Sequence, residues 1–152
     1  MSVKPIPEGF HTVTPYLIIK NASDAIEFYK RAFGATETMR LSGPQGKVGH
    51  AEIRIGSSPL MLADEFPEMG FSGPQGSTGS PVGIHLYVED VDLIFSQAIT
   101  AGAKVLRPVS DQFYGDRSGT LADPFGHIWH VATHKEDLSL DEIKKRAKEH
   151  RE

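Results

Sequence analysis

Two histidines and one glutamate are the residues of this chain best suited to acid–base chemistry. His130 lies in the stretch DPFGHIWHVATH, His85 lies in VGIHLYVE, and Glu52 lies in HAEIRIG. Because a neutral imidazole titrates near physiological pH, His85 or His130 could act as an acid or a base, and either could pair with the Glu52 carboxylate. The competing interpretation is a hydrogen-bonded cavity wall, and we favour it for any single histidine.

Composition excludes several other chemistries and partners. The 152 residues contain no cysteine, which excludes thiolate nucleophiles, disulfides and cysteine-based metal sites. A formal net charge of −4 gives no basic field for nucleic acid, and no apolar run approaches the roughly 20 residues that span a bilayer. The opening residues, MSVKPIPEGFHTVTPY, hold prolines and charges where a secretory signal is apolar, so we expect a cytoplasmic protein without nucleic-acid or membrane partners.

The elements that must position these residues follow from changes in periodicity. After a proline-rich lead (1–12), residues 13–20 are β-branched and aromatic, which predicts a strand. Apolar residues at helical spacing then predict a helix, with Asn21 or Ser23 as N-cap and Gly34 as C-cap. Three short strands are predicted next, at 36–41, 49–55 and 60–64. Residues 13–65 therefore read as one βαβββ unit.

The same order of elements returns after residues 66–81, a linker rich in glycine, proline and serine. Phe66, Met69 and Phe71 are its large apolar residues, and they either pin the linker to the surface or cover a pocket. Residues 82–134 predict a second βαβββ unit, whose helix is capped by Asp90 or Asp92. Its strands are predicted at 82–89, 104–109, 113–122 and 126–134.

Two pairs of strand positions share one offset, because Gly83 follows Thr14 by 69 positions and His130 follows Met61 by 69. Units of this size cannot bury a sheet alone, so the two repeats must pair. We predict an α+β fold in which the repeats form a curled mixed sheet with the helices outside and a concave cavity. A charged helix is expected within 135–152, opened by the capping box Ser139-Leu140-Asp141-Glu142.

Several motifs carry a resemblance to a known family. FYKRAFGA, HAEIRIG, LMLADE, YGDRSGTLADPFGH and WHVATH resemble the vicinal oxygen chelate superfamily, with the glyoxalase and bleomycin-resistance fold, and more narrowly its 3-demethylubiquinone methyltransferase-like (PhnB-like) branch. The resemblance runs from about residue 14 to residue 134. It implies that two chains pair, so we expect a homodimer. It does not select one function, because the superfamily includes isomerases, lyases, dioxygenases and drug-sequestering proteins.

The resemblance also implies where a metal would bind. Family ligands come from the first and last strands of each repeat, which places Thr14, Met61, Gly83 and His130 at the four positions. Only His130 is a competent ligand for a divalent cation, so we predict no metal and no other cofactor.

An alternative register keeps a divalent-metal site open. A shift of two residues replaces Gly83 by His85, and Thr14 by Tyr16, on the same strand faces. His85, His130 and Glu52 would then form the site.

We expect the concave face to hold a small-molecule ligand. If alternation holds on each strand, its lining residues are Thr14, Tyr16, His50, Glu52, Met61, His85, Tyr87 and His130.

Two functions remain open. One is metal-independent binding of a small, partly apolar molecule. The other is a lyase, isomerase or dioxygenase that uses His130 and His85 with a divalent metal or as acid and base. A methyltransferase has no support, because no glycine-rich nucleotide-binding turn joins a strand to a helix.

Overall fold

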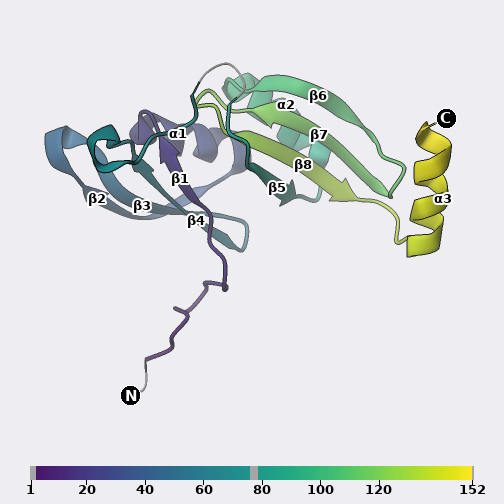
Figure 1. Ribbon diagram of the computed structural model, residues 1–152, viewed down its shortest axis with the longest axis horizontal. Helices are drawn as coiled ribbons and strands as arrows, with labels where there is room; N and C mark the ends of the chain where they lie inside the picture. The colour runs from purple at the N-terminus through teal and green to yellow at the C-terminus, as the bar shows by residue number, and fades with distance from the viewer. Residues whose placement is uncertain (1–2, 76–78, 152) are drawn as a thin grey trace.

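The computed structural model describes residues 3–75 and 79–151 and shows two successive βαβββ units followed by one helix (Figure 1). The first unit contains β1 (Tyr16–Ile19), α1 (Ala22–Phe33), β2 (Thr36–Ser42), β3 (Val48–Ile55) and β4 (Ser58–Asp64). The second contains β5 (Gly83–Tyr87), α2 (Val91–Ala101), β6 (Lys104–Asp111), β7 (Asp116–Ala122) and β8 (Ile128–His134), and α3 (Leu140–Arg151) follows it. Single 3-10 turns lie at Pro44–Gly46 and Pro67–Met69. The predicted α+β class is confirmed.

Each unit forms its own mixed sheet of four strands, in the order β1-β4-β3-β2 and β5-β8-β7-β6. The first pair in each order is parallel and the others are antiparallel. Tyr16 is opposite Met61 and His85 is opposite His130, which reproduces the offset of 69 positions between the repeats. No ladder joins the two sheets among the described strands. The expected concave surface is therefore divided between two open sheets.

The core lies between the helices and one face of each sheet. Ala51 and Ile53 on β3 are fully buried, whereas Glu52 between them points to the other face. On β8, Trp129 and Val131 are fully buried, and the Trp129 ring lies 4.5 Å from the ring of Phe33 on α1. Because successive side chains alternate across a strand, His130 points to the face opposite the helices.

The start of α1 is held by a carboxylate that is distant in sequence. Asp64 at the end of β4 accepts hydrogen bonds from the backbone N–H groups of Asn21 (3.0 Å), Ala22 (2.8 Å) and Val48 (2.7 Å). Asn21 occupies the predicted N-cap position but in a left-handed backbone conformation (φ 78°), and its side chain donates to Asp24 instead. Asp64 thus satisfies N–H groups that a helix leaves free at its start.

The two units are joined through a buried carboxylate, Asp123. Tyr29 on α1 donates its hydroxyl hydrogen to Asp123 Oδ2 (2.6 Å), and Trp129 Nε1 donates to the same oxygen (3.0 Å). The backbone N–H groups of Phe125 and His127 donate to Oδ1. Burial, followed by the charge of Asp123, raises the pKa of Tyr29 well above its ordinary value. This network fixes the first unit against the turn that opens β8.

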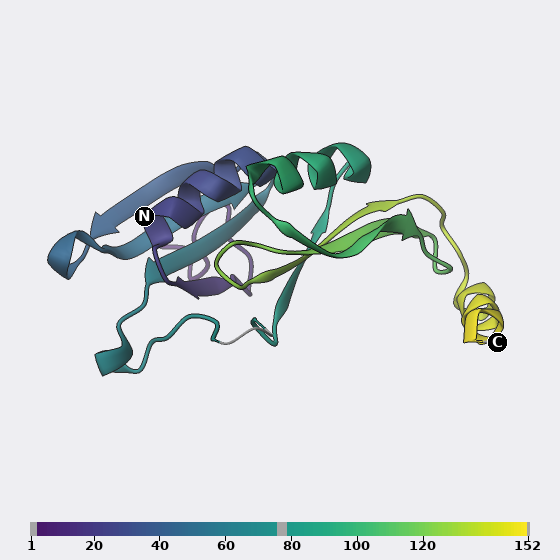
Figure 2. The same ribbon diagram turned by 90° about the horizontal axis from the view of Figure 1, so that it is seen from above.

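Figure 2 shows how the layers are arranged. α1 and α2 lie end to end along one side of the sheets, while the segment after β4 and the C-terminal helix α3 lie toward the other side. The face of the sheets that α1 and α2 do not cover, which Figure 1 presents to the viewer, is called the open face below. None of the described helices is long and apolar enough to cross a membrane.

Candidate functional site

The open face of the first sheet carries a row of directly opposed residues, one from each strand. Tyr16 on β1 is opposite Met61 on β4, Met61 is opposite Glu52 on β3, and Glu52 is opposite Met39 on β2. His50 lies two residues before Glu52 on the same face, where it is opposite Leu41. Four of the eight predicted lining residues, Tyr16, His50, Glu52 and Met61, therefore lie together.

Tyr16, His50 and Glu52 form a continuous hydrogen-bonded chain. The Tyr16 hydroxyl lies 2.8 Å from His50 Nδ1, and His50 Nε2 lies 2.9 Å from Glu52 Oε2. Burial, followed by the negative charge of Glu52, raises the pKa of Tyr16, so its phenol is protonated at neutral pH. The carboxylate orients the imidazole, and the imidazole contacts the phenol, which is an arrangement that can relay a proton.

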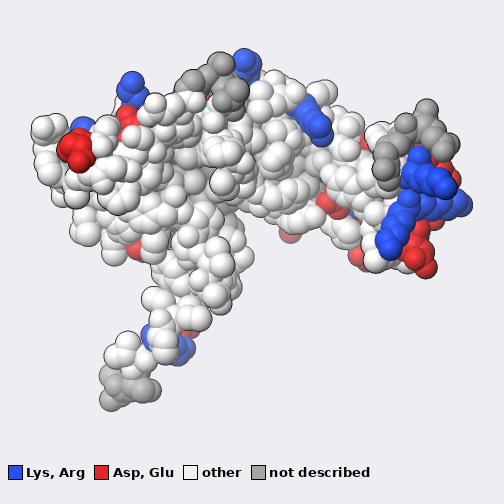
Figure 3. All heavy atoms as spheres, in the orientation of Figure 1, with Lys and Arg blue, Asp and Glu red and all other residues white. Residues whose placement is uncertain are grey.

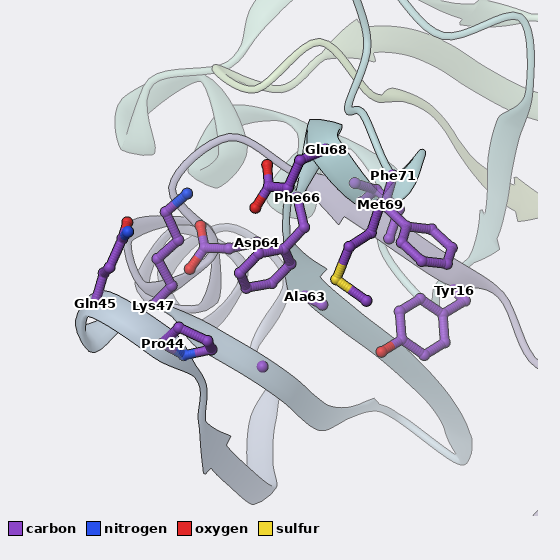
Figure 4. Close-up of a pocket in the computed structure, with 12 residues that line it drawn as sticks. Tyr16, Pro44, Gln45, Lys47, Ala63, Asp64, Phe66, Glu68, Met69 and Phe71 are labelled. Atoms are coloured by element: carbon purple, nitrogen blue, oxygen red, sulfur yellow. The ribbon is translucent and has the colours of Figure 1, made fainter.

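A pocket of about 860 Å³ lies beside this chain, over the outer part of the first sheet (Figure 4). Tyr16, Ile18 and Ala63 line its strand side, and Phe66, Met69 and Phe71 reach over it from the segment after β4. Lys47, Asp64 and Glu68 also line it, and Lys47 Nζ lies 5.2 Å from the centre of the Phe66 ring. The pocket is therefore mainly apolar with a few charged groups.

The apolar residues of the linker are held in a local structure of their own. Phe66 and Phe71 form an isolated antiparallel bridge, in which each donates its N–H to the carbonyl of the other, at 2.8 and 3.2 Å. Farther along, Gly73 donates its N–H to Glu65 Oε2 (2.7 Å). The side chains of Phe66, Met69 and Phe71 lie over the pocket. Of the two arrangements expected for them, pinning the linker to the surface or covering a pocket, this is the second.

The open face of the second sheet carries the corresponding row. His85 on β5 is opposite His130 on β8, His130 is opposite Thr120 on β7, and Thr120 is opposite Arg107 on β6. The His85 and His130 rings are stacked with their centres 6.1 Å apart, and His130 Nδ1 lies 2.9 Å from Thr120 Oγ1. Burial, then the neighbouring His85 and Arg107, lowers the pKa of His130.

Tyr87 lies two residues beyond His85 on this face. Its ring centre lies 4.7 Å from that of His85, and its hydroxyl donates to Asp116 Oδ2 (2.8 Å). His85, Tyr87 and His130 thus form a second group, separate from the first.

One chain does not bring the two groups into one cavity. Glu52 is bonded to His50 on the first sheet, whereas His85 and His130 lie on the second. Thr14 lies before β1 and is half-buried, outside both rows. The alternative metal set of His85, His130 and Glu52 is therefore not assembled within a single chain.

The residues at the family metal positions do not suit a divalent ion. Their donors are a hydroxyl, a thioether and one imidazole, and Gly83 offers no side chain. A Cβ on Gly83 would lie 2.7 Å from Nε2 of His130, so the imidazole already occupies the space of a ligand at that position. Within residues 3–75 and 79–151, no three His, Asp or Glu side chains are grouped so that they could hold a metal.

Several pocket residues were not predicted to line a site. Lys47 and Ile18 line the apolar pocket, and Arg107, Thr120 and His150 line a polar pocket on the second sheet. Alternation on β1 could have identified Ile18, two residues after Tyr16. The others depend on cross-strand register and on the position of α3, which no local pattern encodes.

Comparisons with known proteins agree with this fold. A family model described as Glyoxalase/Bleomycin resistance protein/Dioxygenase superfamily matches residues 9–131. The chain is 45% identical over 134 residues to the uncharacterized protein Mb0911c of Mycobacterium bovis, covering 86% of this chain and 88% of that protein.

Solved structures are similar as well. The structure of the Arabidopsis thaliana gene product At5g48480 has 30% identity and a TM-score of 0.66, covering 81% of this chain and 98% of that one. A Bacillus cereus structure described as a putative 3-demethylubiquinone-9 3-methyltransferase, PhnB protein, has 17% identity and a TM-score of 0.63. The match covers 81% of this chain and 99% of that one. At this identity, the similarity to the Bacillus cereus structure shows a shared fold and nothing about function. The chain belongs to the glyoxalase/bleomycin resistance protein/dioxygenase superfamily.

Proposed function

We propose that this protein binds a small, partly apolar molecule in the pocket of its first unit, without a metal. The observation that carries the proposal is the pocket of about 860 Å³ with Phe66, Met69 and Phe71 on one side and strand residues on the other. Cavities that hold small molecules are typically about 300–1,000 Å³, mainly apolar, and furnished with a few polar groups. Here the Tyr16 hydroxyl, Lys47 and Glu68 supply the polar groups that would orient a ligand.

The covering side chains support the proposal because they remain exposed around the pocket. Met69 is 69% exposed and Phe71 is 52% exposed. Large apolar side chains gathered at a concave surface are costly in water, and a ligand that covers them recovers that free energy. Their exposure is what a binding surface requires.

A second copy of the chain would complete the site. Met39 and Leu41 project from the open face beside Glu52 and His50, and Leu41 is 55% exposed. Exposed apolar residues on a sheet with free edges favour association. The proposed homodimer covers this face and places residues of both chains around the ligand.

The binding proposal is tested by titration with N-phenyl-1-naphthylamine, a neutral apolar dye that fluoresces when it leaves water. The wild-type protein should bind the dye with a saturable increase in fluorescence. Phe71→Ser should weaken binding by roughly fivefold or more, because it removes a large part of the apolar wall. The matched control is Leu93→Ser, on the helix side of the molecule, where the leucine is 59% exposed. Equal dye affinity in the two variants would contradict the proposal.

An enzyme remains a second candidate, and the Tyr16–His50–Glu52 chain is the observation that favours it. Lyases and isomerases commonly abstract a proton next to a carbonyl, and a base oriented by a carboxylate suits that step. His130 with His85 is the other acid–base pair, on the second sheet.

This candidate is tested with hydroxyacetone in deuterated water, by following the loss of its C–H signals by NMR. An enzyme of this kind should accelerate the exchange, and His50→Gln or His130→Gln should abolish the acceleration, which identifies the base. Exchange at the rate of buffer alone would leave binding as the function.

A further inference from the structure

A polar pocket on the open face of the second sheet is not explained by the apolar pocket described above. It has a volume of about 540 Å³ and lies over the row His85, His130, Thr120 and Arg107. Directly opposed residues in a sheet have Cβ atoms about 4.5–5.5 Å apart, so this row presents adjoining side chains across all four strands.

The ionisable side chains around this pocket are basic or neutral. His85, Arg107, His130 and His150 line it together with Tyr114, and no carboxylate is among the lining residues that the structure describes. The remaining polar lining comes from Ser110, Gln112, Ser118 and Thr120. Such a set favours a negatively charged ligand, because every charge it can carry near neutral pH is positive.

Arg107 differs from Arg117, which lies on the same sheet, and from Arg146 on α3. Arg117 is paired with Asp92 and Asp111, and Arg146 is paired with Glu136 and Glu142. Within the described part of the chain, no carboxylate forms an ion pair with Arg107, which is exposed at the pocket. A guanidinium offers a planar fork of donors that matches a carboxylate or phosphate group.

Two polar side chains beside Arg107 are held in place. Gln112 Nε2 donates to the carbonyl oxygen and Oγ of Ser110 (3.3 and 3.2 Å). Thr120 Oγ1 is bonded to His130 Nδ1 at 2.9 Å. When the threonine hydroxyl donates in that bond, His130 carries its proton on Nε2, and that nitrogen is a donor for a ligand. Because Gln112 Nε2 and the Thr120 hydroxyl already donate to protein atoms, His130 Nε2 is the donor that these bonds direct toward a ligand beside Arg107.

The C-terminal helix supplies one side of the pocket. His150 on α3 lines it, and its ring centre lies 5.4 Å from that of Phe113 in the loop before β7. Arg146 donates from Nη1 to the carbonyl oxygen of Phe113 (3.3 Å), which holds α3 against the same loop. Figure 3 shows Lys and Arg side chains of this helix clustered at that end of the molecule, beside acidic ones. α3 lies outside the family-matched residues 9–131.

We propose that this pocket binds the oxyanion of a small molecule, a carboxylate, phosphate or phosphonate group, with Arg107 as its main charged contact and His85, His130 and His150 around it. The site is on the second sheet and does not depend on a ligand in the apolar pocket. It adds a class of ligand that the binding function in the first unit does not specify.

The test is isothermal titration of the wild-type protein with inorganic phosphate, methylphosphonate and acetate, at constant ionic strength and pH 7. At least one of these oxyanions should bind saturably. Arg107→Gln should weaken that binding roughly tenfold or more, as expected for the loss of a charge-assisted hydrogen bond. The matched control is Arg31→Gln, an exposed arginine on α1, which should bind like the wild type.

A second readout separates this proposal from the binding function of the first unit. Arg107→Gln should bind N-phenyl-1-naphthylamine as the wild type does, and Phe71→Ser should bind the oxyanion as the wild type does. NMR signals of the His130 imidazole should move when the oxyanion is added. Absence of saturable binding at 20 mM of all three anions would overturn the proposal. So would equal affinity of wild type and Arg107→Gln.

Discussion

The imidazole of His130 occupies the space above Gly83, since a Cβ at residue 83 would lie 2.7 Å from His130 Nε2. The two positions are diagonal neighbours on β5 and β8, because His130 is opposite His85. A side chain at position 83 and the observed imidazole orientation therefore exclude each other. With no side chain at position 83, the His130 ring fills that space and stacks beside His85 on the same face of the sheet.

Gly83→Ala is expected to turn the His130 ring away from Thr120. The free energy of unfolding should fall by about 1 kcal/mol or less, because a side chain can rotate to relieve the contact. The displaced ring is less buried, so the pKa of His130 should rise toward its ordinary value. An NMR titration of the imidazole measures this, and an unchanged His130 titration would show that the ring does not depend on the glycine.

Tyr29→Phe is expected to weaken the connection between the two units. It removes the 2.6 Å hydrogen bond to Asp123 and leaves a buried carboxylate with one donor fewer. Loss of a buried bond to a charged group typically costs about 1.5–3 kcal/mol, which urea unfolding would measure. Tyr114→Phe, in an exposed loop, is the control and should change stability little. A stability loss no larger than that of the control would show that Asp123 is satisfied without Tyr29.

His130 and His134 lie on the same strand, but their pKa values should depart from the ordinary histidine pKa of 6.5 in opposite directions. The pKa of His134 is raised by its hydrogen bonds to Asp116 and then Asp137, whereas burial lowers that of His130. The stability contributed by His134 is present below pH 6.5 and is lost as pH rises through its raised pKa. The stability contributed by His130 is present above pH 6.5 and is lost as pH falls through its lowered pKa.

NMR titration of the ring protons checks this order directly. Asp116→Asn should lower the pKa of His134 and leave that of His130 unchanged, because Asp116 contacts His134 and not His130. A common pKa for both histidines in the wild type would contradict the assigned contacts.

Leu41→Glu is expected to disrupt the proposed homodimer. The substitution places a charge on the open face beside His50, where a partner chain would have to bury it without compensation. Light scattering at micromolar concentration should report a dimer for the wild type and for Leu93→Glu, but a monomer for Leu41→Glu. A monomeric wild type would remove the basis for a shared cavity.

Much of the fold could be predicted from the sequence because it is encoded by short-range patterns. Alternation on β8 correctly placed Trp129 in the core and His130 on the other face. Gly34 ends α1 in the left-handed conformation that glycine tolerates, and Asp90 caps α2 by accepting from the Leu93 N–H. Each of these features is decided within a few residues.

Other features depend on contacts between distant residues. The N-cap side chain expected from Asn21 or Ser23 is replaced by Asp64, more than forty positions later in the chain. β1 begins at Tyr16 rather than at residue 13, because β-branched composition does not by itself provide a pairing partner. Of the predicted lining residues, Tyr16, His50, Glu52 and Met61 lie on the first sheet, and His85, Tyr87 and His130 lie on the second. Their division between two sheets follows from how the units pack, and Thr14 lies outside both rows.

The arginine of the polar pocket illustrates the same limit. Arg107 reaches the row of His130 only because the register of β6 against β7 shifts on both sides of it. Such bulges change which face a side chain occupies, and they have no reliable signature in a single sequence.

Chemical-shift mapping during titration with N-phenyl-1-naphthylamine tests the central claim most directly, because it locates the ligand on the molecule. The account predicts that the largest saturable changes occur in backbone amides at Lys47, Ala63, Asp64 and residues 66–71, around the pocket of the first unit. Changes confined to the second sheet, or changes that do not saturate, would contradict it.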